Sequence, residues 1–80
     1  MSNIVQIVYS FTMDNMEKII KNILKYKKKK NLSYLKIAKE AGIPFATLEN
    51  IIYSRVSDVK VSTLSKIAKA LTVKIDNLLT

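Results

Sequence analysis

The side chains that could do chemistry in this chain are mostly cations. Fourteen Lys and Arg residues stand against six Asp and Glu residues, giving a formal net charge of +8 over only 80 residues. Such an excess in so short a chain predicts a polyanionic partner, either nucleic acid or an anionic membrane surface. The densest part is the run Lys27–Lys30, which either contacts phosphates or is simply the solvated end of a helix.

The residues that most catalytic and metal sites need are missing. The chain has no cysteine and no histidine, which excludes disulfides, thiol nucleophiles, Cys/His zinc sites and Ser-His triads. A single Gly42 and a single Pro44 exclude a glycine-rich phosphate loop. Eighty residues also leave no room for a sensor domain or a ligand cavity. We therefore expect a non-enzymatic protein with no metal, no cofactor and no small-molecule ligand.

Two short helices joined by a tight turn are predicted between Leu32 and Ile51. Ser33 is a good N-cap for a helix over residues 33–41, which Gly42 ends, and Pro44 then opens a helix over residues 44–53. These are the parts of a helix-turn-helix, whose second helix enters the DNA major groove. By itself the pattern fits a plain helical hairpin equally well.

The elements that would position this pair are also helical. Apolar residues at a helical period predict a first helix over residues 14–30, with its stripe on Met16, Ile19, Ile20, Ile23, Leu24 and Tyr26. Asn31 is expected to close it in the left-handed conformation. Residues 54–61 are predicted to be a loop, Ser62 to cap a helix over 62–71, and residues 75–79 to form a short last helix.

The first segment follows a different period. Residues 3–11 place Val5, Ile7, Tyr9 and Phe11 on one face, which predicts a β-strand. Nothing later in the chain offers a partner, so we expect antiparallel pairing with the same strand of a second molecule. Alternatively, the segment is a disordered extension upstream of a start at Met13 or Met16.

The flanks of the helix pair carry a family resemblance over about residues 16–79. Its elements are Ile37-Ala38, Gly42-Ile43 and the tail Ala70-Leu71-x-Val73-x-Ile75-Asp76-x-Leu78-Leu79. In these the chain resembles the Cro/C1-type helix-turn-helix family, also called XRE or lambda-repressor-like. The resemblance implies an all-α, five-helix DNA-binding domain over residues 14–80. The N-terminal β-strand lies within residues 1–13, which could serve as a dimerisation arm.

The resemblance also implies the roles of individual residues. Residues 33–41 become the positioning helix and 44–53 the recognition helix, with Phe45, Ala46, Thr47 and Asn50 facing bases. These side chains suit an A·T-rich site, although Phe45 could instead be a core aromatic and Asn50 an ordinary exposed residue. Tyr34 takes the place of a phosphate-binding Gln. The expected phosphate contacts are Ser33, Tyr34, Lys28, Lys30, Lys36, Arg55 and Lys60.

One pair of residues departs from the family pattern. Members often carry an Arg late in the first helix and a Glu near the end of the recognition helix, which form a partly buried ion pair. Lys27 and Ile52 occupy these positions here. Because a buried cation without its carboxylate is costly, Lys27 is expected to point to solvent or to phosphate.

These observations predict a sequence-specific transcriptional regulator of double-stranded DNA. We expect a cytoplasmic repressor that acts as a homodimer on a two-fold operator. The alternative is a protein–protein module of the same fold, such as an antitoxin or an adaptor. A membrane-surface role for the lysine-rich first helix is disfavoured, because the core of so small a domain needs its apolar stripe.

Overall fold

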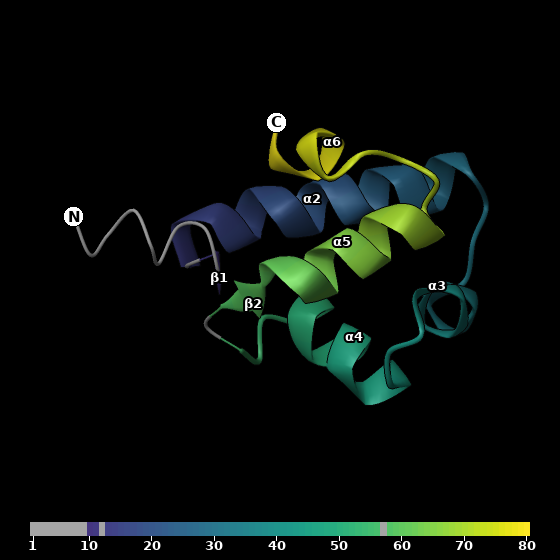
Figure 1. Ribbon diagram of the computed structural model, residues 1–80, viewed down its shortest axis with the longest axis horizontal. Coiled ribbons are helices and arrows are strands. Elements are labelled where there is room, and N and C mark those ends of the chain that lie inside the picture. The colour runs from purple at the N-terminus through teal and green to yellow at the C-terminus, as the bar shows by residue number, and fades with distance from the viewer. Residues whose placement is uncertain (1–9, 12, 57) are drawn as a thin grey trace.

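The computed structural model describes the backbone of residues 10–11, 13–56 and 58–80, and the side chains from Met16 onward except that of residue 57. In the described part, five helices and two short strands follow in the order β1 (Ser10–Phe11), α2 (Met13–Lys29), α3 (Tyr34–Ala41), α4 (Phe45–Ile52), β2 (Val59–Lys60), α5 (Val61–Ala70) and α6 (Ile75–Leu79). Figure 1 shows α6 against α2 on one side of the molecule, and α3 and α4 on the other. The predicted five-helix fold is confirmed.

Local signals place most helix ends where the sequence predicts them. The Ser33 hydroxyl accepts a hydrogen bond from the Lys36 N–H at 3.1 Å, as an N-cap should. Gly42 ends α3 with a φ of 70°, and Asn31 follows α2 with a φ of 54°. Ser54 and Thr72, each with a φ of 56°, do the same after α4 and α5. A left-handed residue therefore follows each of the helices α2 to α5.

The start of α5 differs from the prediction. Ser62 is not its N-cap, because the helix already begins at Val61, and Lys60 occupies the cap position without a side-chain hydrogen bond. The preceding residues are extended as β2, where the sequence predicts only a loop. The backbone conformation needed for strand pairing at residues 59–60 thus also sets the first residue of α5.

The predicted N-terminal strand is described only at its last two residues. Ser10 pairs with Lys60 and Phe11 with Val59 in an antiparallel two-stranded sheet. The expectation that nothing later in the chain could pair with this segment is wrong. β2 was not recognised because a two-residue strand is too short to show a period of two. Residues 3–9, which carry most of the predicted strand, lie outside the described residues.

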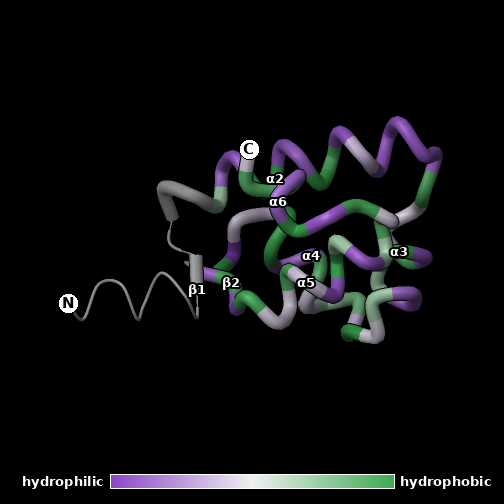
Figure 2. Tube along the Cα trace, turned by 45° about the horizontal axis from the view of Figure 1, so that its top comes forward, coloured by the Kyte–Doolittle hydropathy of each residue, from purple (hydrophilic) through white to green (hydrophobic). Residues whose placement is uncertain are grey.

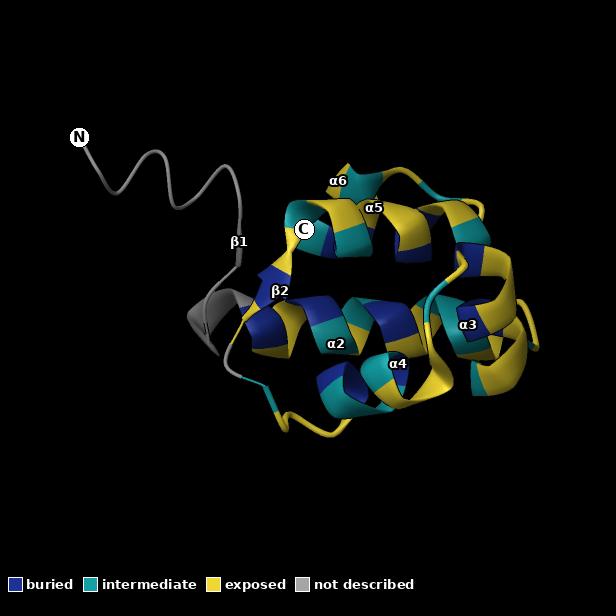
Figure 3. Cartoon of the chain, turned by 60° about the horizontal axis from the view of Figure 1, so that its bottom comes forward, coloured by how far each residue is buried: buried dark blue, intermediate teal, exposed yellow. Residues whose placement is uncertain are grey.

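The core is formed by one apolar face from every helix. Figure 3 shows the buried residues (dark blue) on the inner faces of the helices, and Figure 2 shows hydrophilic residues along the outer edge of α2. The fully buried large side chains are Ile19, Ile23, Ile37, Leu48, Leu64, Ile67, Leu71 and Leu78. Leu24, predicted in the apolar stripe of the first helix, is 37% exposed. Within the described residues, no helix is both long and apolar enough to cross a membrane.

Candidate nucleic-acid interface

Helix α4 separates a core face from an accessible face. Its buried residues are Leu48, Ile51 and Ile52. The four predicted base contacts lie outside this core, with Ala46 exposed and with Thr47 and Asn50 half-buried. Phe45 is 39% exposed, which rules out the core-aromatic alternative for this side chain. The accessible face thus offers one amide, one hydroxyl and two apolar side chains, the types that read base edges in the major groove.

Two of these residues line a groove beside α4. Thr47 and Asn50 face Lys60 across a hollow of about 360 Å³ between α4, the following loop and the start of α5. The other lining residues are Ile51, Val56, Asp58, Val59 and Thr63. The groove therefore brings a predicted phosphate contact next to predicted base contacts. Asp58 adds a carboxylate, which would repel phosphate and can accept a hydrogen bond from cytosine.

A second group of predicted contacts lies where α2 ends and α3 begins. Ser33 is exposed, and Tyr34 is half-buried. The Lys27 ammonium lies 4.5 Å from the centroid of the Tyr34 ring, within the range of a cation–π interaction. Lys27 therefore packs on an aromatic face in this structure, where the sequence predicts that it points to solvent or phosphate. Burial, with a smaller contribution from Tyr53, raises the pKa of Tyr34, so its hydroxyl stays protonated at neutral pH.

The loop after α4 is held by its own contacts. The Arg55 N–H donates to the Asn50 carbonyl at 2.8 Å, and the Arg55 guanidinium lies 5.3 Å from the centroid of the Tyr53 ring. Tyr53 is 53% exposed and closes α4 as its C-cap residue. Arg55 is exposed, as a phosphate contact must be.

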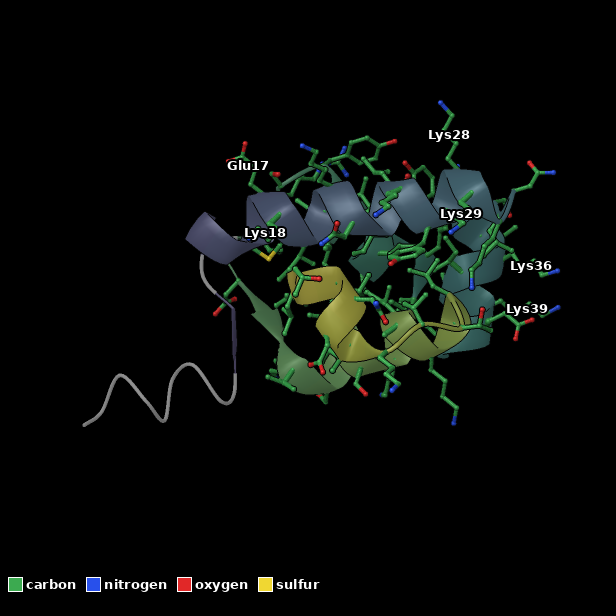
Figure 4. All side chains as sticks on the ribbon, turned by 90° about the horizontal axis from the view of Figure 1, so that it is seen from above. Glu17, Lys18, Lys28, Lys29, Lys36 and Lys39 are labelled. Carbon is green, nitrogen blue, oxygen red and sulfur yellow. The ribbon has the colours of Figure 1, made fainter. Side chains whose placement is uncertain are left out.

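Of the remaining predicted phosphate contacts, Lys28 and Lys36 extend away from the fold (Figure 4), whereas Lys30 is hydrogen-bonded within it. Figure 4 shows Lys28 extending away from α2, and Lys36 extending from α3 at the same end of the molecule. Lys30 instead donates to the carbonyl of Leu71 at 2.6 Å, and to the carbonyl and hydroxyl of Thr72. Its ammonium is thus used to close the C-terminal end of α5.

Lys30 and Lys36 also line a pocket of about 300 Å³ that the sequence did not predict. Its other lining residues are Leu32, Ile37, Glu40, Lys69, Ala70 and Thr72, and none of these belongs to α4. The structure therefore does not bring these two lysines to the groove that holds Thr47 and Asn50.

Sequence reasoning missed three residues near the predicted contacts, and it expected a fourth, Lys27, to point to solvent or phosphate. Asp58 and Thr63 share the groove with Asn50, Lys27 lies over the Tyr34 ring, and Tyr53 contributes to the raised pKa of Tyr34. A signal existed for Lys27, because it replaces an Arg that the family pairs with a Glu. No local pattern marks the other three, whose positions depend on how α4 packs against the loop, α3 and α5.

The comparisons with known proteins decide the family. The model of the Cro/C1-type helix-turn-helix DNA-binding domain matches residues 20–80, more than half of the chain. The chain belongs to this family. The resemblance of its sequence to Cro/C1-type proteins is thereby confirmed.

Two solved structures are similar to this Cro/C1-type domain. One is SinR, described as the master regulator for biofilm formation and solved in complex with DNA, with 27% identity and a TM-score of 0.70 over 78% of this chain and 98% of that one. The other is the restriction-modification controller protein C.AhdI from Aeromonas hydrophila, with 18% identity and a TM-score of 0.72 over 81% of this chain and 97% of that one. At its lower identity, C.AhdI shows the fold alone. The comparison with curated protein sequences gives no match.

Proposed function

We propose that the chain is a sequence-specific transcriptional regulator that inserts α4 into the DNA major groove. The observation that carries this proposal is the accessible side of α4, where Asn50 lies in a groove with Thr47 and the cation Lys60. An amide beside a methyl-bearing side chain can read an A·T pair, while an adjacent cation can bind the flanking phosphate. In this proposal α3 is the positioning helix and α4 the recognition helix.

The individual contacts follow from this placement. The proposed base contacts are Phe45, Ala46, Thr47 and Asn50. The proposed phosphate contacts are Ser33, Tyr34, Lys28, Lys36, Arg55 and Lys60. Lys30 is left out because its ammonium already closes α5. The Ser33 hydroxyl accepts from the Lys36 N–H, which leaves its own O–H free to donate to phosphate.

The proposed regulator is a cytoplasmic, non-catalytic repressor that acts as a homodimer. A single domain with one recognition helix reads only a short half-site, so two copies related by a two-fold axis are needed for a palindromic operator. Residues 1–13 are the proposed dimerisation arm. Within the described chain, Ser10 and Phe11 already pair with β2, so an arm that joins two copies would extend this small sheet.

Selection of bound fragments from a random DNA pool tests the proposal with the full chain. We expect enrichment of two A·T-rich half-sites whose centres lie about one helical turn, roughly 34 Å, apart. The variant Asn50→Ala, carried through the same selection, should lose the adenine preference at one position of each half-site. If the wild-type chain enriches no sequence, it does not bind DNA specifically, and the hypothesis of a protein–protein module of the same fold is favoured instead.

A further inference from the structure

The replacement of the family's ion pair leaves Lys27 with another partner. Ile52, at the position of the usual Glu, is buried at 8% exposure and packs in the core. Lys27 is half-buried near the end of α2, and its ammonium lies 4.5 Å from the centroid of the Tyr34 ring. A cation over an aromatic face is attracted by the ring quadrupole, so Lys27 has a favourable partner although the carboxylate is missing.

Tyr34 is restricted on more than one side. Tyr34 packs against the hydrophobic core, and burial, with a smaller contribution from Tyr53, raises the pKa of its phenol. Lys27 and Tyr53 come from α2 and from the end of α4, whereas Tyr34 is the first residue of α3. The cation of Lys27 and the packing against the core therefore both restrict the Tyr34 ring, and its O–H is a donor at the start of the positioning helix.

We propose that Lys27 is a positioning residue, which acts on DNA through Tyr34 and not by binding a phosphate itself. The cation holds the Tyr34 ring so that its O–H points at one phosphate oxygen, the task that an amide side chain performs in other family members. The proposal rests on the proposed function, because it assigns how that interface holds one phosphate. It also predicts that Arg can replace Lys27, since a guanidinium stacks on aromatic rings as well.

A salt titration of DNA binding distinguishes a lysine that binds a phosphate directly from a lysine that only positions another side chain. Each cation that neutralises a phosphate contributes about 0.9 to the slope of log K against log salt, whereas a neutral donor contributes nothing. Fluorescence anisotropy with a labelled duplex, over a series of salt concentrations, gives both the affinity and this slope. The full chain is used as wild type and as Lys27→Met, Lys27→Arg, Tyr34→Phe and the double variant Lys27→Met/Tyr34→Phe.

The chain offers a matched control in Lys25→Met. The Lys25 ammonium also lies over a tyrosine, 5.4 Å from the centroid of the Tyr26 ring, and its loss changes the net charge equally. Neither Lys25 nor Tyr26 belongs to the proposed interface. The control therefore measures what the loss of one charge, and of one cation–π contact on α2, does to DNA binding.

The expected results form one pattern. Tyr34→Phe should weaken binding by between about 10-fold and about 160-fold, the range for a hydrogen bond to a charged group, without changing the slope. Lys27→Met should weaken DNA binding in the wild-type background, and its salt slope should equal that of the Lys25→Met control. When Tyr34→Phe is already present, Lys27→Met should lower the affinity little further. Lys27→Arg should bind like wild type, and thermal unfolding of each variant identifies any that fails to fold.

Three results would overturn the proposal. The first is a Lys27→Met variant that binds as well as Lys25→Met. The second is a slope that falls by about 0.9 relative to that control, which indicates a direct phosphate contact. The third is a full, additive loss in the double variant. Failure of the proposed function is distinguishable from all three, because wild type itself would then bind the selected duplex no more tightly than a random duplex of the same length.

Discussion

Replacing Lys30 with methionine should lower the stability of the domain more than its affinity for DNA. The ammonium donates to the Leu71 carbonyl at 2.6 Å and also contacts Thr72, the left-handed residue that ends α5. Leu71 is the C-cap residue of α5 and Thr72 follows it, so the ammonium lies at the C-terminal end of the helix, where the macrodipole favours a cation. Lys30 directly follows α2, so this contact between residues 41 apart in the chain joins the C-terminal ends of α2 and α5.

The magnitude follows from two stabilising contributions and one opposing cost. A hydrogen bond from a charged donor stabilises by about 1.5–3 kcal/mol, with the lower end appropriate to a part-buried group. A cation at a helix C-terminus adds about 0.3–1 kcal/mol, and ordering a lysine side chain costs up to about 2 kcal/mol. The net loss in the free energy of unfolding is therefore about 1 kcal/mol, equivalent to a fall in Tm of about 4–8 °C for a domain of this size.

Lys28→Met is the matched control, because Lys28 is exposed and extends away from α2 (Figure 4). Thermal unfolding followed by circular dichroism should change little for Lys28→Met, since surface substitutions usually stay within about 0.5 kcal/mol. The salt slope of DNA binding should instead fall by about 0.9 for Lys28→Met, and it should fall less for Lys30→Met. An unchanged Tm for Lys30→Met, or a slope that falls as far as for Lys28→Met, would refute the helix-closing role.

Three further predictions concern other parts of the chain. Asn50→Ala should lose about 1–3 kcal/mol of binding at the selected site and little on random duplex, and an unchanged ratio of the two would contradict base reading. Ser54→Gly should raise the free energy of unfolding by about 0.5–1 kcal/mol, because Ser54 has a left-handed φ of 56° that glycine adopts without strain. The control Ser62→Gly, within α5, should lower the free energy of unfolding, and equal shifts of the two variants in thermal unfolding would contradict backbone strain at Ser54. Deleting residues 1–12 should leave a monomer that binds DNA weakly, and light scattering that still finds a dimer of equal affinity would refute the arm.

The deletion is informative because it removes β1 together with the segment before it. Ser10 and Phe11 pair with β2, which directly precedes α5 and lines the groove beside α4. A control that replaces residues 1–9 with a polar sequence keeps this pairing and removes only the apolar side chains. Loss of the dimer in both variants would assign dimerisation to those side chains.

Local signals in the sequence determined the helices and most of their ends. Ser33, Gly42 and Asn31 act on the backbone within one helical turn, through a cap hydrogen bond or a left-handed φ, so no tertiary contact is needed to predict them. The period of the apolar residues likewise determined which helix faces are buried. The family and its DNA-binding character also followed from the sequence, because their motifs are short and contiguous.

Contacts between distant parts of the chain were decided only by the tertiary structure. Strand β2 becomes extended where residues 10–11 pair with it, and Lys30 turns from a predicted phosphate contact into the closing group of α5. Lys27 finds the Tyr34 ring because α2 and α3 meet at that point. Each of these contacts depends on how a strand or a long side chain is directed toward another element of the fold, and a hydrophobic period or a cap signal carries no information about that direction.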